Sequence, residues 1–312
     1  MRHGPRFIDL FAGIGGVHIA FTNAGAKCVF ASEYNERARE TYIYNFKKNN
    51  PELFEIARSA DSAEMPKFYG DITKATALMR KGIDPIPDFD VLTGGFPCQP
   101  FSQAGLRKGL EEARGTLFFD ILQILKTKKA AGKPVKAFFL ENVQGLLNHR
   151  SGDQLTIQVM ERRLKRLGYT FAVYKVRASD FGVPQHRPRL FLIGFFDHEA
   201  AKRFVSPSKK KLRKGTLSRI LGGSVDREIG WTLRVGGRGS GLHDRRNWDT
   251  YLVDGIPLRI SSVHGLRLQR FPASFRFPPT VTETQRMNQL GNSVAIPAVQ
   301  AYAEALLKAL AH

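Results

Sequence analysis

The feature that most constrains this chain is a regular alternation of short apolar runs and helix-like stretches between Arg6 and Phe196. The apolar runs are continuous, which is typical of strands that are buried on both faces. We therefore predict an α/β fold built on a doubly wound, mostly parallel sheet. The predicted strands span residues 7–11, 27–32, 67–69, 89–93, 135–140, 171–176 and 190–196, and the predicted helices span 16–24, 36–47, 73–80, 116–126 and 154–167.

The regular pattern stops after Phe196. Only a turn-rich segment separates the last two predicted strands, so we expect them to pair as a hairpin. Residues 197–283 hold a lysine-rich tract, a glycine-rich loop and short irregular β-like runs, and residues 293–311 read as a helix. We therefore expect a large domain of residues 1–197 plus 284–312, and a smaller, irregular, β-rich domain of residues 198–283.

Composition excludes several classes of protein. A hydrophobic content of 42% over 312 residues supports a substantial core. The apolar runs are too short to cross a bilayer, and the first residues lead directly into a strand, so we expect a cytoplasmic chain without membrane contact. Cys28 and Cys98 make no disulfide framework, and no Cys/His cluster has zinc-ligand spacing, so we expect no metal.

Charge points to a polyanionic partner. The net charge is +20, and residues 198–283 alone carry 17 Lys and Arg against 7 Asp and Glu. A basic excess concentrated in one segment favours nucleic acid, although a solvated basic surface is the alternative.

Three motifs at predicted strand ends carry chemically useful groups. Cys98 follows strand 89–93 on a loop shaped by glycines and prolines, where an accessible thiolate can act as a nucleophile. Glu141 ends strand 135–140, where a poorly solvated carboxyl can serve as a proton donor. Arg187 and Arg189 precede strand 190–196 and, two residues apart, point the same way. A loop cysteine without a role remains the alternative for Cys98 alone.

A second set of residues indicates a nucleoside site. The glycine-containing stretch 11–16 follows the first strand and opens a helix, so its backbone can approach a ligand closely. Glu33 ends the second strand, where a carboxylate can bind both hydroxyls of a ribose, and Asp71 follows the third. A helix N-cap is the alternative for each acid, and NAD is an alternative ligand for such a sheet.

The chain resembles the C5-cytosine DNA methyltransferases over essentially its whole length. The resemblance rests on motifs that occur in the family's order, namely Phe7-Ile8-Asp9-Leu10-Phe11-Ala12-Gly13-Ile14-Gly15-Gly16, Pro97-Cys98-Gln99, Glu141-Asn142-Val143, Gln185-x-Arg187-x-Arg189 and Gln289-Leu290-Gly291-Asn292-Ser293-Val294. It implies a Rossmann-like methyltransferase fold and a smaller target-recognition domain.

The resemblance also implies the cofactor, S-adenosyl-L-methionine, which leaves as S-adenosyl-L-homocysteine. Phe11 would lie against the adenine, Glu33 would hold the ribose and Asp71 would accept from the exocyclic amine. The rest of the implied pocket consists of Ala12, Gly13, Gly15, Gly16, Tyr34, Ile72, Pro97, Leu117, Asn292 and Ser293.

For the reaction, the resemblance implies that the Cys98 thiolate adds to C6 of cytosine while Glu141 donates a proton at N3. Asn142 would hold the Glu141 loop or the base amino group. Arg189 would contact the base O2, and Arg187 would support Cys98, Glu141 or a phosphate. Because a stacked base cannot reach such a pocket, the cytosine would be flipped out of the helix.

Double-stranded DNA is the partner that we expect, with a monomeric enzyme and a cognate restriction endonuclease acting separately, as in bacterial modification systems. Loop 99–114 would fold over the DNA, with Gln99 and Ser102 as contacts. The arginines that could read bases or contact phosphates are Arg234, Arg238, Arg245 and Arg246. We expect Trp231 and Trp248 in the core of the small domain. An RNA cytosine methyltransferase and a catalytically silent DNA-binding regulator are the alternatives.

Overall fold

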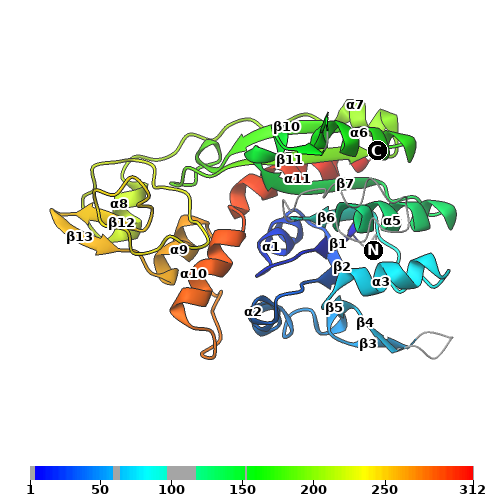
Figure 1. Cartoon of the computed structure of the whole chain (residues 1–312), viewed down its shortest axis with the longest axis horizontal. Helices are drawn as coiled ribbons and strands as arrows, with labels where there is room; N and C mark the ends of the chain where they lie inside the picture. The colour runs from blue at the N-terminus through cyan, green and yellow to red at the C-terminus, as the bar shows by residue number, and fades with distance from the viewer. Residues whose placement is uncertain (1–3, 59–63, 97–116, 152, 312) are drawn as a thin grey trace.

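The computed structural model describes residues 4–58, 64–96, 117–151 and 153–311. Its centre is a seven-stranded sheet of order β10-β11-β7-β6-β1-β2-β5 (Figure 1). The five strands from β5 to β7 are parallel, and β11 runs antiparallel to both β7 and β10. The strands are β1 (Arg6–Leu10), β2 (Lys27–Ser32), β5 (Phe68–Tyr69), β6 (Val91–Gly94), β7 (Ala137–Val143), β10 (Ala172–Arg177) and β11 (Pro188–Phe195). The predicted doubly wound sheet and its closing hairpin are confirmed.

Helices cover both faces of the sheet, because neighbouring residues of each strand point into different cores. On β7, Phe138 packs into one hydrophobic cluster and Phe139 into the other. One face carries α3 (Ile72–Arg80), α5 (Leu117–Ala130) and α6 (Thr156–Arg166). The opposite face carries α1 (Gly16–Asn23), α2 (Glu36–Phe46) and α11 (Ile296–Leu310).

The C-terminal region differs from the expected single helix. Two helices are present, α10 (Glu283–Asn292) and α11, with Ser293 as the C-cap of the first. A capping box between Thr282 and Gln285 starts α10, and Pro297 lies in the first turn of α11, where a missing N–H costs nothing. The sequence signal missed α10 because its polar residues carry little helical periodicity.

The segment of residues 198–283 is less β-rich than predicted. All of its residues are described, and its one ladder is the hairpin of β12 (Thr250–Val253) and β13 (Ile256–Arg259). Three short helices accompany it, α7 (His198–Arg203), α8 (Thr216–Leu221) and α9 (Ser262–Leu268). The hairpin, α8 and α9 gather at one end of the molecule (Figure 1). Side-chain contacts to the backbone, rather than ladders, hold the loops between them.

The remaining elements are short. They are the strands β3 (Ile56–Arg58), β4 (Glu64–Pro66), β8 (Arg150–Ser151) and β9 (Gln154–Leu155), and the 3₁₀ helices η1 (Pro51–Leu53), η2 (Gln144–Leu147) and η3 (Ala178–Asp180). Within the described ranges, no helix has both the length and the apolar character needed to cross a bilayer. The predicted domain boundaries stay a prediction, since one hydrophobic cluster contains both Val299 of α11 and Trp248 of the smaller segment.

Candidate active site

A cavity of about 890 Å³ opens where the parallel strands end. It receives residues from both sets that the sequence singled out, which are brought together by the shared edge of the sheet. The predicted residues that line it are Phe11, Gly13, Glu33, Tyr34, Asp71, Ile72, Leu117, Glu141, Asn142, Arg189 and Asn292. The structure therefore places several candidate cofactor residues and three candidate catalytic residues, Glu141, Asn142 and Arg189, around one space.

The glycine-containing loop bends sharply between β1 and α1. Phe11 adopts a positive φ of 57°, and Gly15, the N-cap of α1, has a φ of 86°. Gly13 faces the cavity and donates its N–H to Glu33 Oε2 over 2.8 Å. Three predicted cofactor residues, Ala12, Gly15 and Gly16, do not line the cavity but shape the loop beneath it.

Ser293 lies behind this loop rather than in the cavity. A Cβ added to Gly16 would stand 2.9 Å from Ser293 Oγ, so a glycine is required for the closing motif to pack on the opening one. The two motifs are far apart in sequence, and their contact fixes the loop from its far side.

Glu33 is held by backbone donors on both oxygens. Oε1 accepts from Asn35 N over 2.7 Å, and Oε2 accepts from Gly13 N. Burial raises the pKa of this carboxyl above its usual value, partly opposed by those hydrogen bonds. Arg39 also donates to the carbonyl of Tyr34 over 2.9 Å, while the Tyr34 side chain is 78% exposed at the cavity mouth.

Asp71 is the N-cap of α3, the alternative that the sequence left open. Its Oδ1 accepts from Thr73 N at 3.0 Å and from Thr73 Oγ1 at 2.7 Å. Oδ2 has no partner among the described residues, and Asp71 lines the cavity. One carboxylate can therefore cap the helix with one oxygen and accept from a ligand with the other.

Glu141 and Arg189 form the charged pair of the catalytic half. Antiparallel pairing of β7 with β11 sets Arg189 opposite Val143, close to Glu141. Arg189 Nε lies 2.7 Å from Glu141 Oε1, and both side chains are largely buried. A Cβ on Gly95 would lie 3.4 Å from Glu141 Oε2. The second oxygen therefore faces the segment that leads from β6 toward Cys98.

Asn142 holds the backbone segment that follows β6. It is buried, and its Nδ2 donates to Phe96 O over 3.0 Å while its Oδ1 accepts from Val143 N over 2.8 Å. Phe96 stands two residues before Cys98, so Asn142 connects the end of β7 to the start of the nucleophile segment.

Arg187, the residue before β11, differs from Arg189, which lies within that strand. Arg187 is 2% exposed and donates to the carbonyls of Leu233, at 3.1 Å, and Gly291, at 2.8 Å. It also donates to Ser293 O. Burial lowers the pKa of this guanidinium. In this conformation its hydrogen bonds join the start of β11 to the smaller segment and to the end of α10, and its predicted support of Cys98, Glu141 or a phosphate stays a prediction.

Four predicted residues lie outside the described part of the chain. They are Cys98, the proposed nucleophile, Pro97, and the proposed DNA contacts Gln99 and Ser102, together with the rest of the expected closing loop 99–114.

The four candidate DNA-binding arginines have different surroundings. Arg234 and Arg245 are exposed and have no partner within the described ranges. Arg238 donates to Ile260 O over 3.0 Å and is partly buried. Arg246 pairs with Asp244 over 2.7 Å, which holds the pKa of that carboxyl at about 2.

The predicted core position is confirmed for Trp248, which is 2% exposed. Trp231 is half-buried against Tyr251, with ring centroids 4.7 Å apart.

Sequence reasoning missed several residues that line the cavity, and two of them, Gln289 and Asp120, carry polar contacts. Gln289 belongs to the closing motif, and no other feature of the sequence marks it as a cavity residue. Its side-chain oxygen accepts from Thr41 Oγ1 over 2.9 Å, and its Nε2 donates to Arg37 O over 3.0 Å. Asp120 lies in the first turn of α5 and accepts from Arg80 over 3.0 Å. Among the residues that the structure describes, no group of three or more His, Cys, Asp or Glu could hold a metal ion.

Comparison with known proteins identifies the family. The C-5 cytosine-specific DNA methylase family matches residues 5–234 and 245–308. Type II methyltransferase M.NlaX of Neisseria lactamica is 36% identical, over 98% of this chain and 97% of its own. M.HhaI of Haemophilus parahaemolyticus is 31% identical, over 95% of this chain and 92% of its own.

Solved structures agree on the fold. The Dnmt2 methyltransferase of S. pombe superposes with a TM-score of 0.65 at 18% identity, over 99% of both chains. A putative DNA modification methyltransferase encoded within an E. coli prophage gives a TM-score of 0.60 at 21% identity, over 99% of this chain and 100% of its own. With residues of four of the motifs around one cavity and the family matched across nearly the whole chain, the protein belongs to the C-5 cytosine-specific DNA methylase family and is a DNA cytosine-5 methyltransferase.

Proposed function

We propose that this enzyme methylates carbon 5 of a flipped-out cytosine within a short, specific sequence of double-stranded DNA. The methyl donor is S-adenosyl-L-methionine, and the reaction passes through a covalent bond between Cys98 and C6. One observation carries the proposal: a single cavity is lined both by Glu33 and Asp71 and by Glu141 and Arg189. A donor and a base can therefore meet in one cavity.

The first half of the cavity suits an adenosine. Each Glu33 oxygen accepts one backbone N–H and keeps a lone pair for a ribose hydroxyl. Asp71 Oδ2 is available for an exocyclic amine, and Phe11, Tyr34 and Ile72 supply apolar surface for the ring. When bound there, S-adenosyl-L-methionine supplies an electrophilic methyl group.

The second half suits the cytosine. The Cys98 thiolate adds to C6, Glu141 donates a proton at N3, and the electron pair displaced from the 5,6 double bond makes C5 nucleophilic. After C5 gains the methyl group it loses its proton to a base, and elimination of the Cys98 thiolate restores the double bond while N3 returns its proton to Glu141. Arg189, beside Glu141, would contact the base O2.

The surface of the enzyme suits a DNA duplex. A net charge of +20 favours association with the phosphate backbone, and the exposed Arg234 and Arg245 extend from the smaller segment. Flipping the target base costs a few kcal/mol, which these contacts would offset. We propose that the enzyme acts as a monomer. Its relatives are named Type II methyltransferases, so a separate cognate endonuclease is a further proposal.

The test is methyl transfer from labelled S-adenosyl-L-methionine to unmethylated plasmid DNA, followed by bisulfite sequencing. Protected cytosines confined to one short motif would support the proposal. Labelling of transfer RNA but not of DNA would contradict it and identify an RNA substrate instead.

Cys98→Ser tests the covalent step. We expect methylation to be lost while binding to target DNA is retained or tightened, because a serine hydroxyl is a poor nucleophile at neutral pH. Cys28→Ser is the matched control, since Cys28 is buried in β2 away from the cavity. Equal loss of DNA binding in Cys98→Ser would contradict a purely nucleophilic role.

A further inference from the structure

We propose that Asn247, Trp248 and Asp249 form a clamp that holds the glycine-rich loop of residues 236–242 in one conformation before DNA arrives. In this proposal Arg238 is a positioning residue of the clamp and not a DNA contact. The consequence for target selection rests on the proposed function, whereas the clamp itself concerns the free protein.

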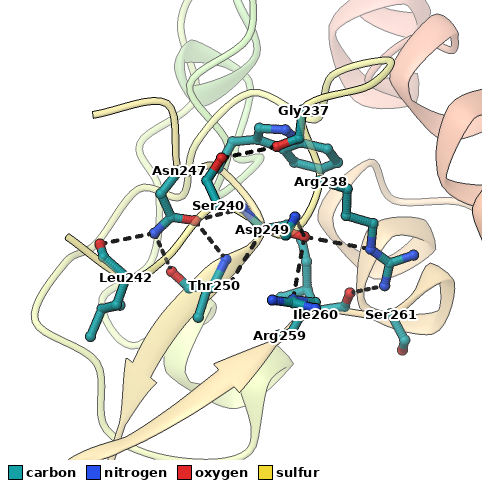
Figure 2. A network of polar contacts seen from close by, with 12 residues as sticks. Gly237, Arg238, Ser240, Leu242, Asn247, Asp249, Thr250, Arg259, Ile260 and Ser261 are labelled. Atoms are coloured by element: carbon teal, nitrogen blue, oxygen red, sulfur yellow. Dashed lines mark hydrogen bonds and ion pairs between the residues drawn. The ribbon is translucent and has the colours of Figure 1, made fainter. Parts of the chain in front are cut away.

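Three consecutive side chains hold three points of the loop, and Figure 2 shows the first of them, Asn247, against Leu242. Asn247 Nδ2 donates to Leu242 O over 3.2 Å. The Trp248 indole donates to Gly236 O over 3.1 Å. Asp249 Oδ2 accepts from Gly239 N over 3.2 Å. All three residues are buried, so the loop is fixed from below along most of its length.

Asn247 also forms hydrogen bonds with the backbone of the two residues that follow Trp248. Asn247 Oδ1 accepts from Asp249 N, at 3.2 Å, and from Thr250 N, at 3.0 Å, while its Nδ2 also donates to Thr250 O over 2.8 Å. Asn247 therefore uses both ends of its amide, which is the behaviour of a buried polar side chain with a structural role.

Asp249 requires positive charge near it. Its side chain is 0% exposed, and a buried carboxylate is costly unless it is paired. Arg238 Nε lies 3.5 Å from Asp249 Oδ2, and Arg259 Nε lies 3.7 Å from the same oxygen (Figure 2). Two guanidinium groups thus compensate one buried charge.

The other contacts of Arg238 also point inward. Its Nη2 donates to Ile260 O over 3.0 Å and lies 3.8 Å from Glu283 Oε1 at the start of α10. Because the guanidinium joins the loop to the end of β13 and to α10, a contact with DNA would require these interactions to break.

The base of the loop is anchored separately. Arg187 donates to Leu233 O, and Gly291 approaches the backbone of Arg234 so closely that an added Cβ would lie 2.6 Å from Arg234 O. With its base held by β11 and α10 and its upper part held by the clamp, the loop has little freedom to adapt to a non-target sequence.

Hydrogen exchange of the free protein tests the clamp without DNA. We expect Asp249→Asn and Arg238→Gln to increase exchange of the amides of residues 236–242. Asp249→Asn keeps the size of the side chain and an acceptor for Gly239, so it removes mainly the charge. Arg245→Gln, on an exposed arginine without a partner in the described ranges, should leave that exchange unchanged. Unchanged exchange in Arg238→Gln would overturn the clamp role of Arg238.

Salt dependence of DNA binding separates positioning from contact. A lost phosphate contact lowers the slope of log K against log salt by about 1. We expect Arg238→Gln to keep the wild-type slope but to lose roughly tenfold in preference for target over non-target DNA. A reduced slope with normal exchange in the free protein would show that Arg238 contacts DNA itself.

A double variant tests whether Arg238 and Asp249 act as one unit. If Arg238 acts through Asp249, Arg238→Gln combined with Asp249→Asn should lose no more discrimination than Asp249→Asn alone. Additive losses would overturn the proposal. If wild-type protein binds no DNA selectively, the proposed function fails, and the exchange experiment still decides whether the clamp exists.

Discussion

At the scale of single residues, position on a strand does not decide what a side chain does. Arg187 and Arg189 stand two residues apart at the start of β11, yet Arg189 pairs with Glu141 in the cavity and Arg187 binds three backbone carbonyls. Asp71 shows the converse, because one carboxylate caps a helix and also lines the cavity. Roles at this scale depend on depth of burial as well as on direction.

Replacing Glu33 tests the ribose contact. We expect Glu33→Ala to weaken S-adenosyl-L-methionine binding roughly 10- to 100-fold, because hydrogen bonds to a charged group are worth about 1.5–3 kcal/mol. Calorimetry with the cofactor alone measures this, and DNA affinity should change much less. Glu36→Ala is the control, since that side chain is 88% exposed at the start of α2. A larger loss of DNA affinity than of cofactor affinity would refute the ribose assignment.

Replacing Glu141 tests the proton donor. We expect Glu141→Gln to lower kcat by about 10²- to 10⁴-fold, the usual contribution of general acid catalysis. Gel-shift affinity for target DNA should stay within a few fold, because glutamine preserves the shape of the side chain. Glu161→Gln on α6, away from the cavity, provides the control. Wild-type turnover in Glu141→Gln would show that Glu141 is not the proton donor.

At the scale of elements, α10 connects the two ends of the molecule. Its Gln289 accepts a hydrogen bond from Thr41 of α2 beside the cofactor half of the cavity, and its Gly291 carbonyl accepts from Arg187, the residue before β11. Its first residue, Glu283, accepts from Ser262 of α9 over 2.6 Å. This helix therefore sets how the smaller segment stands relative to the sheet.

Adding one methyl group at Gly291 tests that connection. An added Cβ would lie 2.6 Å from the Arg234 carbonyl, so the backbone must shift. We expect Gly291→Ala to lower the free energy of unfolding by about 1–3 kcal/mol, measured by urea denaturation. Gly145→Ala is the matched change, because the nearest atom to its Cβ is 3.9 Å away. Equal stability of the two variants would contradict the close approach.

At the scale of the whole molecule, two buried ionisable groups beneath the loop of residues 11–16 affect the pH dependence of stability in opposite directions. Burial lowers the pKa of His18 to about 3 and raises that of Asp9 to about 7. The unfolded imidazole binds a proton below about 6.5, whereas the folded one does not, so His18 costs stability as pH falls from 6.5 toward 3. Asp9 costs stability as pH rises from about 4 toward 7.

Replacing His18 isolates its contribution to the pH dependence of stability. We expect the stability of His18→Gln relative to wild type to rise by at most about 1.4 kcal/mol per pH unit as pH falls from 6.5 to 5. Urea denaturation at several pH values measures it. His198→Gln, at an exposed position, is the control variant. A difference that is independent of pH would mean that the folded imidazole is protonated like the unfolded one.

The sequence alone determined the sheet and the identity of the site. Continuous apolar runs marked strands such as β7, and short motifs at strand ends marked Glu33, Asp71, Glu141 and Arg189. Such signals are local, because a strand buried on both faces must be apolar throughout and a parallel sheet places polar residues at one edge. No contact between distant segments was needed to read them.

Tertiary structure alone decided which arginines face outward. Arg234 and Arg238 stand four residues apart in one glycine-rich stretch, yet the first is exposed and the second lies against Asp249 and Ile260. The buried charge of Asp249 and the carbonyls left by irregular loops must be satisfied by whatever donors the fold brings near. That requirement depends on three-dimensional proximity, which no local pattern of residues encodes.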